Sequence, residues 1–300
     1  MSAFLTTNSV AMNSVPLTTA PAAGTTTTQQ PVFNIGGGGV LFWWMAGAIK
    51  ELCHKGPNSL TEHYSLRGAS AGALAAVLGA CQIDTEDALD LAHKLALENG
   101  VFERPLGLVG VWGGMLRTWL HHLLPEDAAE RCSGKVQVVV TAVPRLKREI
   151  ISNFKNKNEV IEACLGSAHV PFLMDGKFAA RIKGQRVVDG ALLDAFQQAR
   201  DVVTGSILFP SWVKLRWGPF ALLNHNSDNR SASVKTEKVG FSGDMVHLSY
   251  HQDEELRKKG LGFFRVRCVE DIREMMDMGS AYGKKLRHQL ALPLEEGSMD

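Results

Sequence analysis

The pentapeptide Gly68-Ala69-Ser70-Ala71-Gly72 is the feature that most restricts how this chain can fold. A β-prone run (63–67) precedes it and a strong helix former (73–81) follows it. A G-x-S-x-G turn between a strand and a helix is typical of a nucleophile elbow, in which the glycines allow close packing and the serine hydroxyl stands out of the sheet. The positive end of the new helix favours negative charge beside that hydroxyl. A chance match is the alternative, but the strand and helix flanks favour Ser70 as an acyl-transfer nucleophile.

Strand and helix patterns alternate from residue 31 onward, which predicts an α/β fold with three layers and a mostly parallel central sheet. The expected strands are 32–35, 63–67, 135–142 and 186–188. The expected helices are 40–55, 73–81, 84–99 (capped by Thr85 and stopped by Gly100), 158–165 and 269–290. Because ligands bind beyond the carboxyl ends of parallel strands, we expect Ser70 and the residues after strands 32–35 and 186–188 to meet there.

A glycine run, Gly36 to Gly39, follows the first expected strand and opens a helix. Its backbone N–H groups can surround an anion, although a flexible turn or a phosphate loop would use the same residues. The nucleotide fingerprints fail, because no Gly-Lys-Ser/Thr follows and Leu41-Phe42 stand where G-x-G-x-x-G needs its last glycine. An oxyanion hole is the best remaining use. We expect a side chain at Gly38 to displace this loop or restrict its φ angle, lowering kcat about 100-fold with little change in KM.

The motif Val188-Asp189-Gly190-Ala191 ends the last expected strand of the first 200 residues. An Asp-Gly pair after a strand is commonly only a turn. It becomes a candidate site because its strand would end beside the elbow. An aspartate in water, with a pKa near 3.9, is a poor base at neutral pH. Burial in an apolar cleft would raise the pKa of Asp189 and make it able to take the serine proton.

A catalytic triad is the competing interpretation. An α/β-hydrolase places serine, acid and histidine in that order, which Ser70, Asp189 and one of His225, His247 or His251 would satisfy. Nothing in the sequence around these histidines supports that role, so the pattern favours a structural role for each.

Three motifs in order (a glycine-rich loop after the first strand, G-x-S-x-G, and D-G-A) resemble the patatin-like phospholipase family. Within it, the chain is similar to the adipose triglyceride lipase and adiponutrin branch. The similar segments are 123–128, 152–154, 157–161 and 170–172. The likeness extends over about residues 31–196 and does not include the N-terminal thirty residues.

The resemblance implies a Ser–Asp dyad without histidine, with Ser70 as nucleophile and Asp189 as general base. It implies an oxyanion hole from Gly37, Gly38 and Gly39. The activity it implies is a serine hydrolase that cleaves triacylglycerol or phospholipid esters through an acyl-enzyme, without cofactor or metal. Its partner would be a lipid ester at a membrane or lipid-droplet surface.

Two departures from the family pattern keep alternatives open. Leu41-Phe42 stand where the family often has Arg or Lys followed by Gly, and Asp194 and Phe196 stand where it has Asn and Pro. The first departure could reshape the oxyanion hole and leave a catalytically weak lipid-binding protein. A further alternative is an esterase or thioesterase that uses the same Ser70 on soluble acyl substrates.

Composition restricts partners and compartment. The chain has 32 Lys and Arg against 31 Asp and Glu, a balance that predicts no nucleic-acid partner. Its five cysteines form no C-x-x-C pair, which predicts reduced core residues in a reducing compartment. The adjacent His121-His122 pair is wrongly spaced for two metal ligands on one helical face. The sequence points to no particular protein partner.

Three segments are expected. Residues 1–30 are uncharged and rich in Thr, Ser and Ala, which predicts a disordered leader without a secretory signal; organelle targeting has weak support. Residues 31–205 would form the catalytic domain. Residues 206–300 would be a covering segment, whose aromatic stretch 209–220 packs on the sheet or lies at a lipid interface. With no apolar run long enough to span a bilayer, we expect a cytoplasmic protein peripherally associated with a membrane or lipid droplet.

Overall fold

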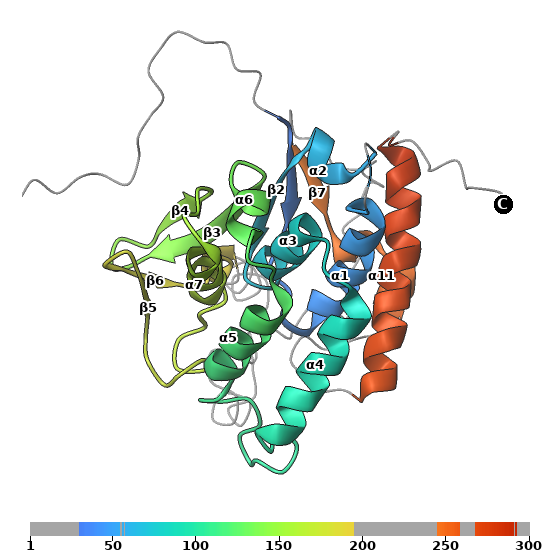
Figure 1. The fold of residues 1–300 in the computed structure, drawn as a ribbon. Helices are drawn as coiled ribbons and strands as arrows, with labels where there is room; N and C mark the ends of the chain where they lie inside the picture. Colours follow the sequence, from blue (N-terminus) through green and yellow to red (C-terminus); the bar gives the residue numbers. More distant parts are fainter. Residues whose placement is uncertain are drawn as a thin grey trace, which may run out of the picture.

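The computed structural model describes residues 30–194 apart from 55 and 57, together with 245–258, 268–290 and 292. The strands are β1 (Val32–Ile35), β2 (Ser65–Ala69), β3 (Val136–Ala142), β4 (Lys147–Ile151), β5 (Ala180–Ile182), β6 (Gln185–Val188) and β7 (Met245–Leu248). The helices are η1 (Gly39–Leu41), α1 (Phe42–Leu52), α2 (Leu60–His63), α3 (Ala71–Cys81), α4 (Thr85–Glu98), α5 (Trp112–Leu123), α6 (Ala128–Cys132), α7 (Lys157–Ser167), η3 (Tyr250–Gln252), α10 (Glu254–Lys258) and α11 (Val269–Gln289). Figure 1 shows them as one sheet with helices packed around it.

The seven strands form a single mixed sheet, in which hydrogen-bonded neighbours follow the order β5-β6-β3-β2-β1-β7 and β4 also pairs with β3. β7, β1, β2 and β3 are parallel neighbours. β4 and β6 run antiparallel to β3, and β5 runs antiparallel to β6. Five of the seven strands therefore point in one direction. This confirms the predicted α/β class with a mostly parallel sheet.

The strand that leads to Asp189 differs from the expectation of parallel strands. β6 is antiparallel to β3, and a two-residue hairpin turn connects it to β5, with which it also pairs in antiparallel fashion. Both turn residues, Lys183 (φ 48°) and Gly184 (φ 85°), have positive φ, as a type I′ turn requires. Such a turn can join only antiparallel neighbours, whereas a parallel neighbour needs a long crossover. The Lys-Gly pair was the sequence signal for the β5–β6 hairpin.

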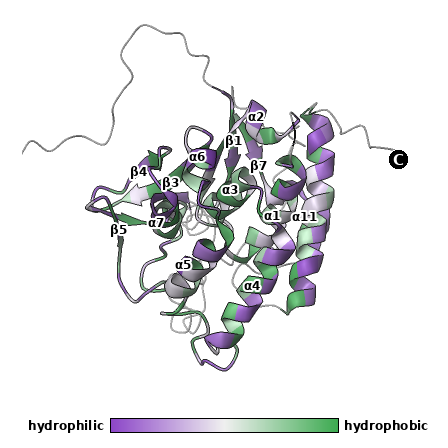
Figure 2. Cartoon of the chain, in the orientation of Figure 1, coloured by the Kyte–Doolittle hydropathy of each residue, from purple (hydrophilic) through white to green (hydrophobic). Residues whose placement is uncertain are grey.

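Helices are stacked outward from the sheet. α3 packs on β1, β2 and β3, and α7 packs on β3. α1 packs on α3, and α11 packs along α1. The bands of hydrophilic and hydrophobic residues along α4 and α11 in Figure 2 fit helices with one buried face.

Glycines set the short distance between α1 and α11. A Cβ on Gly47 would lie 2.1 Å from the Met276 carbonyl oxygen, and one on Gly279 would lie 2.0 Å from the Trp44 carbonyl oxygen. The backbones therefore touch where no side chain separates them. Gly47 and Gly279 thus allow α11 to pack closely against α1.

The final described segments are integrated with the rest of the fold. β7 pairs with β1, and α11 covers α1 as the amphipathic pattern of residues 269–290 indicates. The division at residue 205 stays a prediction, and the leader and the aromatic stretch 209–220 lie outside the described residues. None of the helices in the described part of the chain combines the length and apolarity that a membrane crossing needs.

Two local expectations are corrected. Asp84, not Thr85, caps α4: its side chain accepts the N–H groups of Glu86 and Asp87, because a carboxylate placed just before the helix reaches them. The cysteines are free as expected, and Cys53, Cys81, Cys132 and Cys164 are buried. Cys268 is instead exposed, since it precedes α11 at the surface.

Candidate active site

The elbow has the strained geometry that its sequence predicts. Ser70 has φ 54° and ψ −124° between β2 and α3, a conformation that a non-glycine residue rarely adopts. A Cβ on Gly68 would lie 2.3 Å from the Gly72 carbonyl oxygen, and one on Gly72 would lie 2.2 Å from the Ile35 carbonyl oxygen. Both glycines are therefore required by close backbone contact, in agreement with the elbow pattern.

The sheet register brings Asp189 to the elbow. β4 occupies one edge of β3 along Val138–Ala142, so β2 and β6 must share the other edge. On that edge β2 ends with Ala69 opposite Val139, while the antiparallel β6 ends with Val188 opposite Thr141. The two strands thus approach one another end to end, with one β3 residue between them. The residues that follow, Ser70 and Asp189, meet there.

The two side chains form a short hydrogen bond: Ser70 Oγ donates to Asp189 Oδ2 at 2.6 Å. The second carboxylate oxygen, Oδ1, accepts the Ala191 N–H at 2.7 Å. The Asp189 main chain is fixed as well, because its N–H donates to the His169 carbonyl at 2.9 Å and its carbonyl accepts the Thr141 hydroxyl at 2.9 Å. The carboxylate therefore has one defined orientation toward the serine.

Asp189 is only 4% exposed. Burial raises the pKa of its carboxyl from 3.8 to about 6, and the charge of Asp194 adds to the rise. The hydrogen bonds from Ser70 and Ala191 act in the opposite direction. At neutral pH the group is ionised and is a better base than a carboxylate in water.

The glycine loop lies against this pair. An ideal Cβ on Gly37 would lie 2.5 Å from the Ala191 Cβ and 3.4 Å from the Ser70 Cβ. Among the described residues, neither Gly37 nor Gly38 donates its N–H to an acceptor. Such N–H groups beside a serine hydroxyl are suited to stabilise the oxyanion of a tetrahedral intermediate.

The expectation for Gly38 needs correction. Its φ of −166° is extended backbone that any residue adopts, and a Cβ there would first meet the flexible end of Met45, at 2.6 Å. The left-handed position in the loop is Gly39, with φ 54°. Leu41 and Phe42, which depart from the family pattern, are buried in the core at 2% and 8% exposure.

The described histidines provide no third member of a triad. His247 on β7 has its Nδ1 3.1 Å from the Asn34 amide nitrogen, and the His251 ring lies against that of Tyr250, tilted by 41° with ring centroids 4.2 Å apart. In the described part of the chain, no histidine side chain bonds to Ser70 or Asp189; His225 lies outside it. The described residues also hold no group of three His, Cys, Asp or Glu side chains arranged for a metal ion.

Sequence reasoning missed three features of this site. Ser167 and Thr141 contact the backbones of the two central residues, and nothing in their sequence context distinguishes them. The third is the loop that follows His169, which exposes two aromatic residues, Phe172 (61%) and Phe178 (53%). The similarity of segment 170–172 to the family branch was the available signal for that loop.

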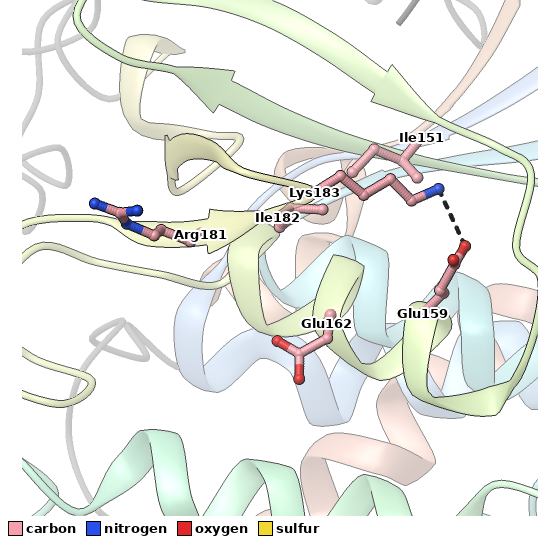
Figure 3. Close-up of a pocket in the computed structure, with 6 residues that line it drawn as sticks. All are labelled: Ile151, Glu159, Glu162, Arg181, Ile182 and Lys183. Atoms are coloured by element: carbon pink, nitrogen blue, oxygen red, sulfur yellow. Dashed lines mark ion pairs between the residues drawn. The ribbon is translucent and has the colours of Figure 1, made fainter.

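A surface cavity of about 170 Å³ lies elsewhere on the protein, between β4, β5 and α7. Figure 3 shows its lining residues, with Lys183 directed at Glu159, an ion pair of 3.1 Å. The cavity includes neither the dyad nor the glycine loop. Its lining is Ile151, Glu159, Glu162, Arg181, Ile182 and Lys183.

Comparison with known proteins gives the same assignment as the motifs. The family model for patatin-like phospholipases matches residues 34–198, more than half of the chain, including the glycine loop, the elbow and Asp189. The chain is 33% identical over 146 residues to an omega-hydroxyceramide transacylase of Mus musculus. This match covers 48% of this chain and 24% of the transacylase.

Two human proteins are also similar. The 1-acylglycerol-3-phosphate O-acyltransferase PNPLA3 is 32% identical over 53% of this chain and 34% of its own length. Patatin-like phospholipase domain-containing protein 2 is 33% identical over 42% of this chain and 25% of its own length. The matches thus span only 24% to 34% of these relatives' own length. The solved structure of VipD from Legionella pneumophila overlaps 87% of this chain and 67% of its own at a TM-score of 0.36 and 11% identity, values too low to carry an argument. The family match, and the three motifs assembled at one site of a mostly parallel sheet, show that this chain belongs to the patatin-like phospholipase family.

Proposed function

We propose that the protein is a lipid acyl hydrolase that cleaves carboxylic esters through a Ser70–Asp189 dyad and an acyl-enzyme. The observation that carries the proposal is the 2.6 Å hydrogen bond from Ser70 Oγ to a buried carboxylate. A serine hydroxyl needs an adjacent base to become a nucleophile, and Asp189 is the base within reach.

In the first half-reaction, Ser70 Oγ attacks the ester carbonyl carbon while its proton moves to Asp189 Oδ2. The carbonyl oxygen becomes an oxyanion, which the N–H groups of Gly37, Gly38 and Gly39 and the positive end of α3 stabilise. The C–O bond of the ester then breaks, and the alcohol departs with the proton from Asp189. Ser70 remains acylated.

In the second half-reaction, Asp189 takes a proton from water, and the resulting hydroxide attacks the acyl carbon. The second tetrahedral intermediate collapses, the fatty acid leaves, and Ser70 Oγ recovers its proton from Asp189. Two successive acyl transfers through one enzyme intermediate predict ping-pong kinetics.

A lipid surface is the proposed location of the substrate, either triacylglycerol or phospholipid in a membrane or lipid droplet. The loop with Phe172 and Phe178 supports this proposal. His169, three residues before Phe172, accepts the Asp189 N–H, so the loop leads directly from the dyad. The φ of Phe172 is 67°, a strained angle for an aromatic residue whose ring remains exposed. Exposed aromatic rings are suited to the lipid–water interface.

A lipid-surface role predicts a selective defect. Phe172→Ser combined with Phe178→Ser should lower hydrolysis of long-chain esters in phosphatidylcholine vesicles by about tenfold or more. The same variant should retain its rate on a soluble short-chain p-nitrophenyl ester. Equal rates on vesicles for wild type and variant would instead favour the soluble esterase or thioesterase interpretation.

Acyl transfer to an alcohol is a second candidate function, because two of the relatives are named as a transacylase and an acyltransferase. An alcohol in place of water at the second step would give a new ester with the same residues. Adding monoacylglycerol to the assay and measuring released fatty acid against new diacylglycerol would distinguish the two functions.

The central test is active-site labelling with a fluorophosphonate, followed by ester hydrolysis. Wild type should be labelled at Ser70, Ser70→Ala should be neither labelled nor active, and Asp189→Asn should lose activity by orders of magnitude. His247→Ala and His251→Ala are the controls and should retain most activity. An unlabelled wild type would favour the weak lipid-binding alternative, and a histidine variant as inactive as Ser70→Ala would indicate a triad.

A further inference from the structure

Ser167, the last residue of α7, is completely buried and lies where three elements of the site meet. Its hydroxyl oxygen is 2.9 Å from the Ser70 backbone nitrogen and 2.6 Å from the Val139 carbonyl oxygen. Its own carbonyl accepts the Gly190 N–H at 3.0 Å. One residue therefore contacts the elbow, the central strand β3 and the turn that carries Asp189.

The direction of each hydrogen bond is fixed by chemistry. The Val139 carbonyl can only accept, so the single Ser167 hydroxyl proton points toward it. A lone pair of the same oxygen then faces the Ser70 N–H, which can only donate. Only this orientation of the Ser167 hydroxyl satisfies both neighbours, so it is a rigid link between β3 and the elbow.

The Ser70 N–H has particular need of this acceptor. β2 ends at Ala69, so the Ser70 N–H lies just past the strand, where Ser167 Oγ is its acceptor, and Ser70 itself has a strained positive φ. A strained backbone conformation persists only where its surroundings hold it, and a buried N–H without an acceptor costs about 1–3 kcal/mol. Since this N–H is occupied by Ser167, it is also withheld from an oxyanion.

We propose that Ser167 is a positioning residue for acyl transfer: it holds the strained elbow and the Asp189 turn in one register, so that Ser70 Oγ stays within hydrogen-bonding distance of Asp189. The proposal rests on the proposed dyad and adds a residue that touches neither the substrate nor the reacting atoms. Replacement of the side chain removes its bonds to the elbow and to β3, whereas the main-chain bond from Gly190 remains.

The test compares Ser167→Ala with Ser59→Ala in the full-length protein. Ser59 is a matched control, because it is buried like Ser167, with 2% exposure, and its hydroxyl also forms a hydrogen bond, 2.9 Å long, to the Thr61 hydroxyl. The readouts are the Tm, the rate of fluorophosphonate labelling, and the pH dependence of that rate. Labelling depends on the serine and its base and not on the identity of the lipid.

Ser167→Ala should be folded and labelled about 10- to 100-fold more slowly than wild type. The acidic limb of its labelling rate against pH should move to higher pH, because the hydrogen bond from Ser70 lowers the pKa of Asp189 and a displaced serine no longer makes that bond. Ser59→Ala should change only the Tm.

Labelling of Ser167→Ala at the wild-type rate, with the wild-type pH dependence, would overturn the positioning role and leave the dyad intact. A slower rate with an unmoved acidic limb and a Tm loss like that of Ser59→Ala would also overturn it. If Ser167→Ala does not fold, Ser167→Cys replaces it, since a thiol has similar shape but is a weak acceptor; that variant should show the same two kinetic changes. A wild type that is not labelled would refute both the dyad and this proposal.

Discussion

Asp189→Asn should inactivate the protein and, at neutral pH, make it more stable. The Asp189 side chain is buried, and Asn has nearly the same shape. Its amide oxygen can accept the Ala191 N–H in place of Oδ1. Its amide N–H can donate to Ser70 Oγ, which has free lone pairs, so the 2.6 Å contact persists with the donor reversed. What the substitution removes is a buried negative charge, and with it the base.

The magnitude follows from the pKa of Asp189, which burial raises from 3.8 to about 6. Below pH 3.8 the carboxyl is protonated in both folded and unfolded chains, and its neutral form contributes fully to stability. As the pH rises toward 6, the unfolded chain releases this proton while the folded chain retains it, so wild type loses stability. Above that range the loss is complete, at about 3 kcal/mol. The variant has no such dependence, so its advantage should grow by about 2–3 kcal/mol between pH 4 and pH 8.

Urea unfolding of both proteins at several values between pH 4 and pH 8 measures this difference directly. Comparing the two proteins at each pH cancels the other titrating groups, which are common to both. A difference that stays constant across this range, or that shrinks as the pH rises, would refute the assignment of a buried, ionised Asp189. Ser70→Ala is the matched control. It removes a hydrogen bond that lowers the Asp189 pKa, so the total loss of stability with rising pH should be larger than in wild type and should extend to higher pH.

Three further predictions follow from other contacts. Wild-type kcat/KM should fall below about pH 6 with a single acidic limb, measured on a soluble ester, because protonated Asp189 cannot act as base; a limb below pH 4.5 would contradict this. Gly37→Ala should lower kcat by about 100-fold, because its Cβ would meet Ala191 and Ser70. Gly38→Ala should lower kcat much less, because the end of the Met45 side chain can move aside. A larger loss of kcat in Gly38→Ala than in Gly37→Ala would exclude the proposed loop geometry. Gly279→Ala should destabilise the fold by about 3 kcal/mol or more, because its Cβ would overlap the Trp44 carbonyl. Gly114→Ala on α5 should instead stabilise the fold by up to about 1 kcal/mol, because a Cβ at Gly114 would meet no atom within 4 Å. Thermal unfolding of the two variants checks both predictions.

The sequence by itself determined the local parts of this site. The elbow at Ser70 was predictable because two glycines around a serine, between a β-prone and a helical run, allow few other conformations. Strand β1 was predicted with its observed bounds, and the covering helix α11 within one residue, because hydrophobic periodicity and helix-stop residues are local signals. The order of three motifs was enough to predict the family.

Tertiary structure decided how these parts meet. No local signal showed that β6 pairs antiparallel with β3 and ends against β2 along the same edge of β3, although that arrangement brings Ser70 Oγ within 2.6 Å of Asp189 Oδ2. The pKa of Asp189 likewise depends on burial by residues far away in the chain. Ser167 is an ordinary serine in sequence, and its place between the elbow and β3 depends on how α7 packs. Periodicity and turn chemistry act over a few residues, whereas register, burial and hydrogen-bond partners are set by segments about a hundred residues apart.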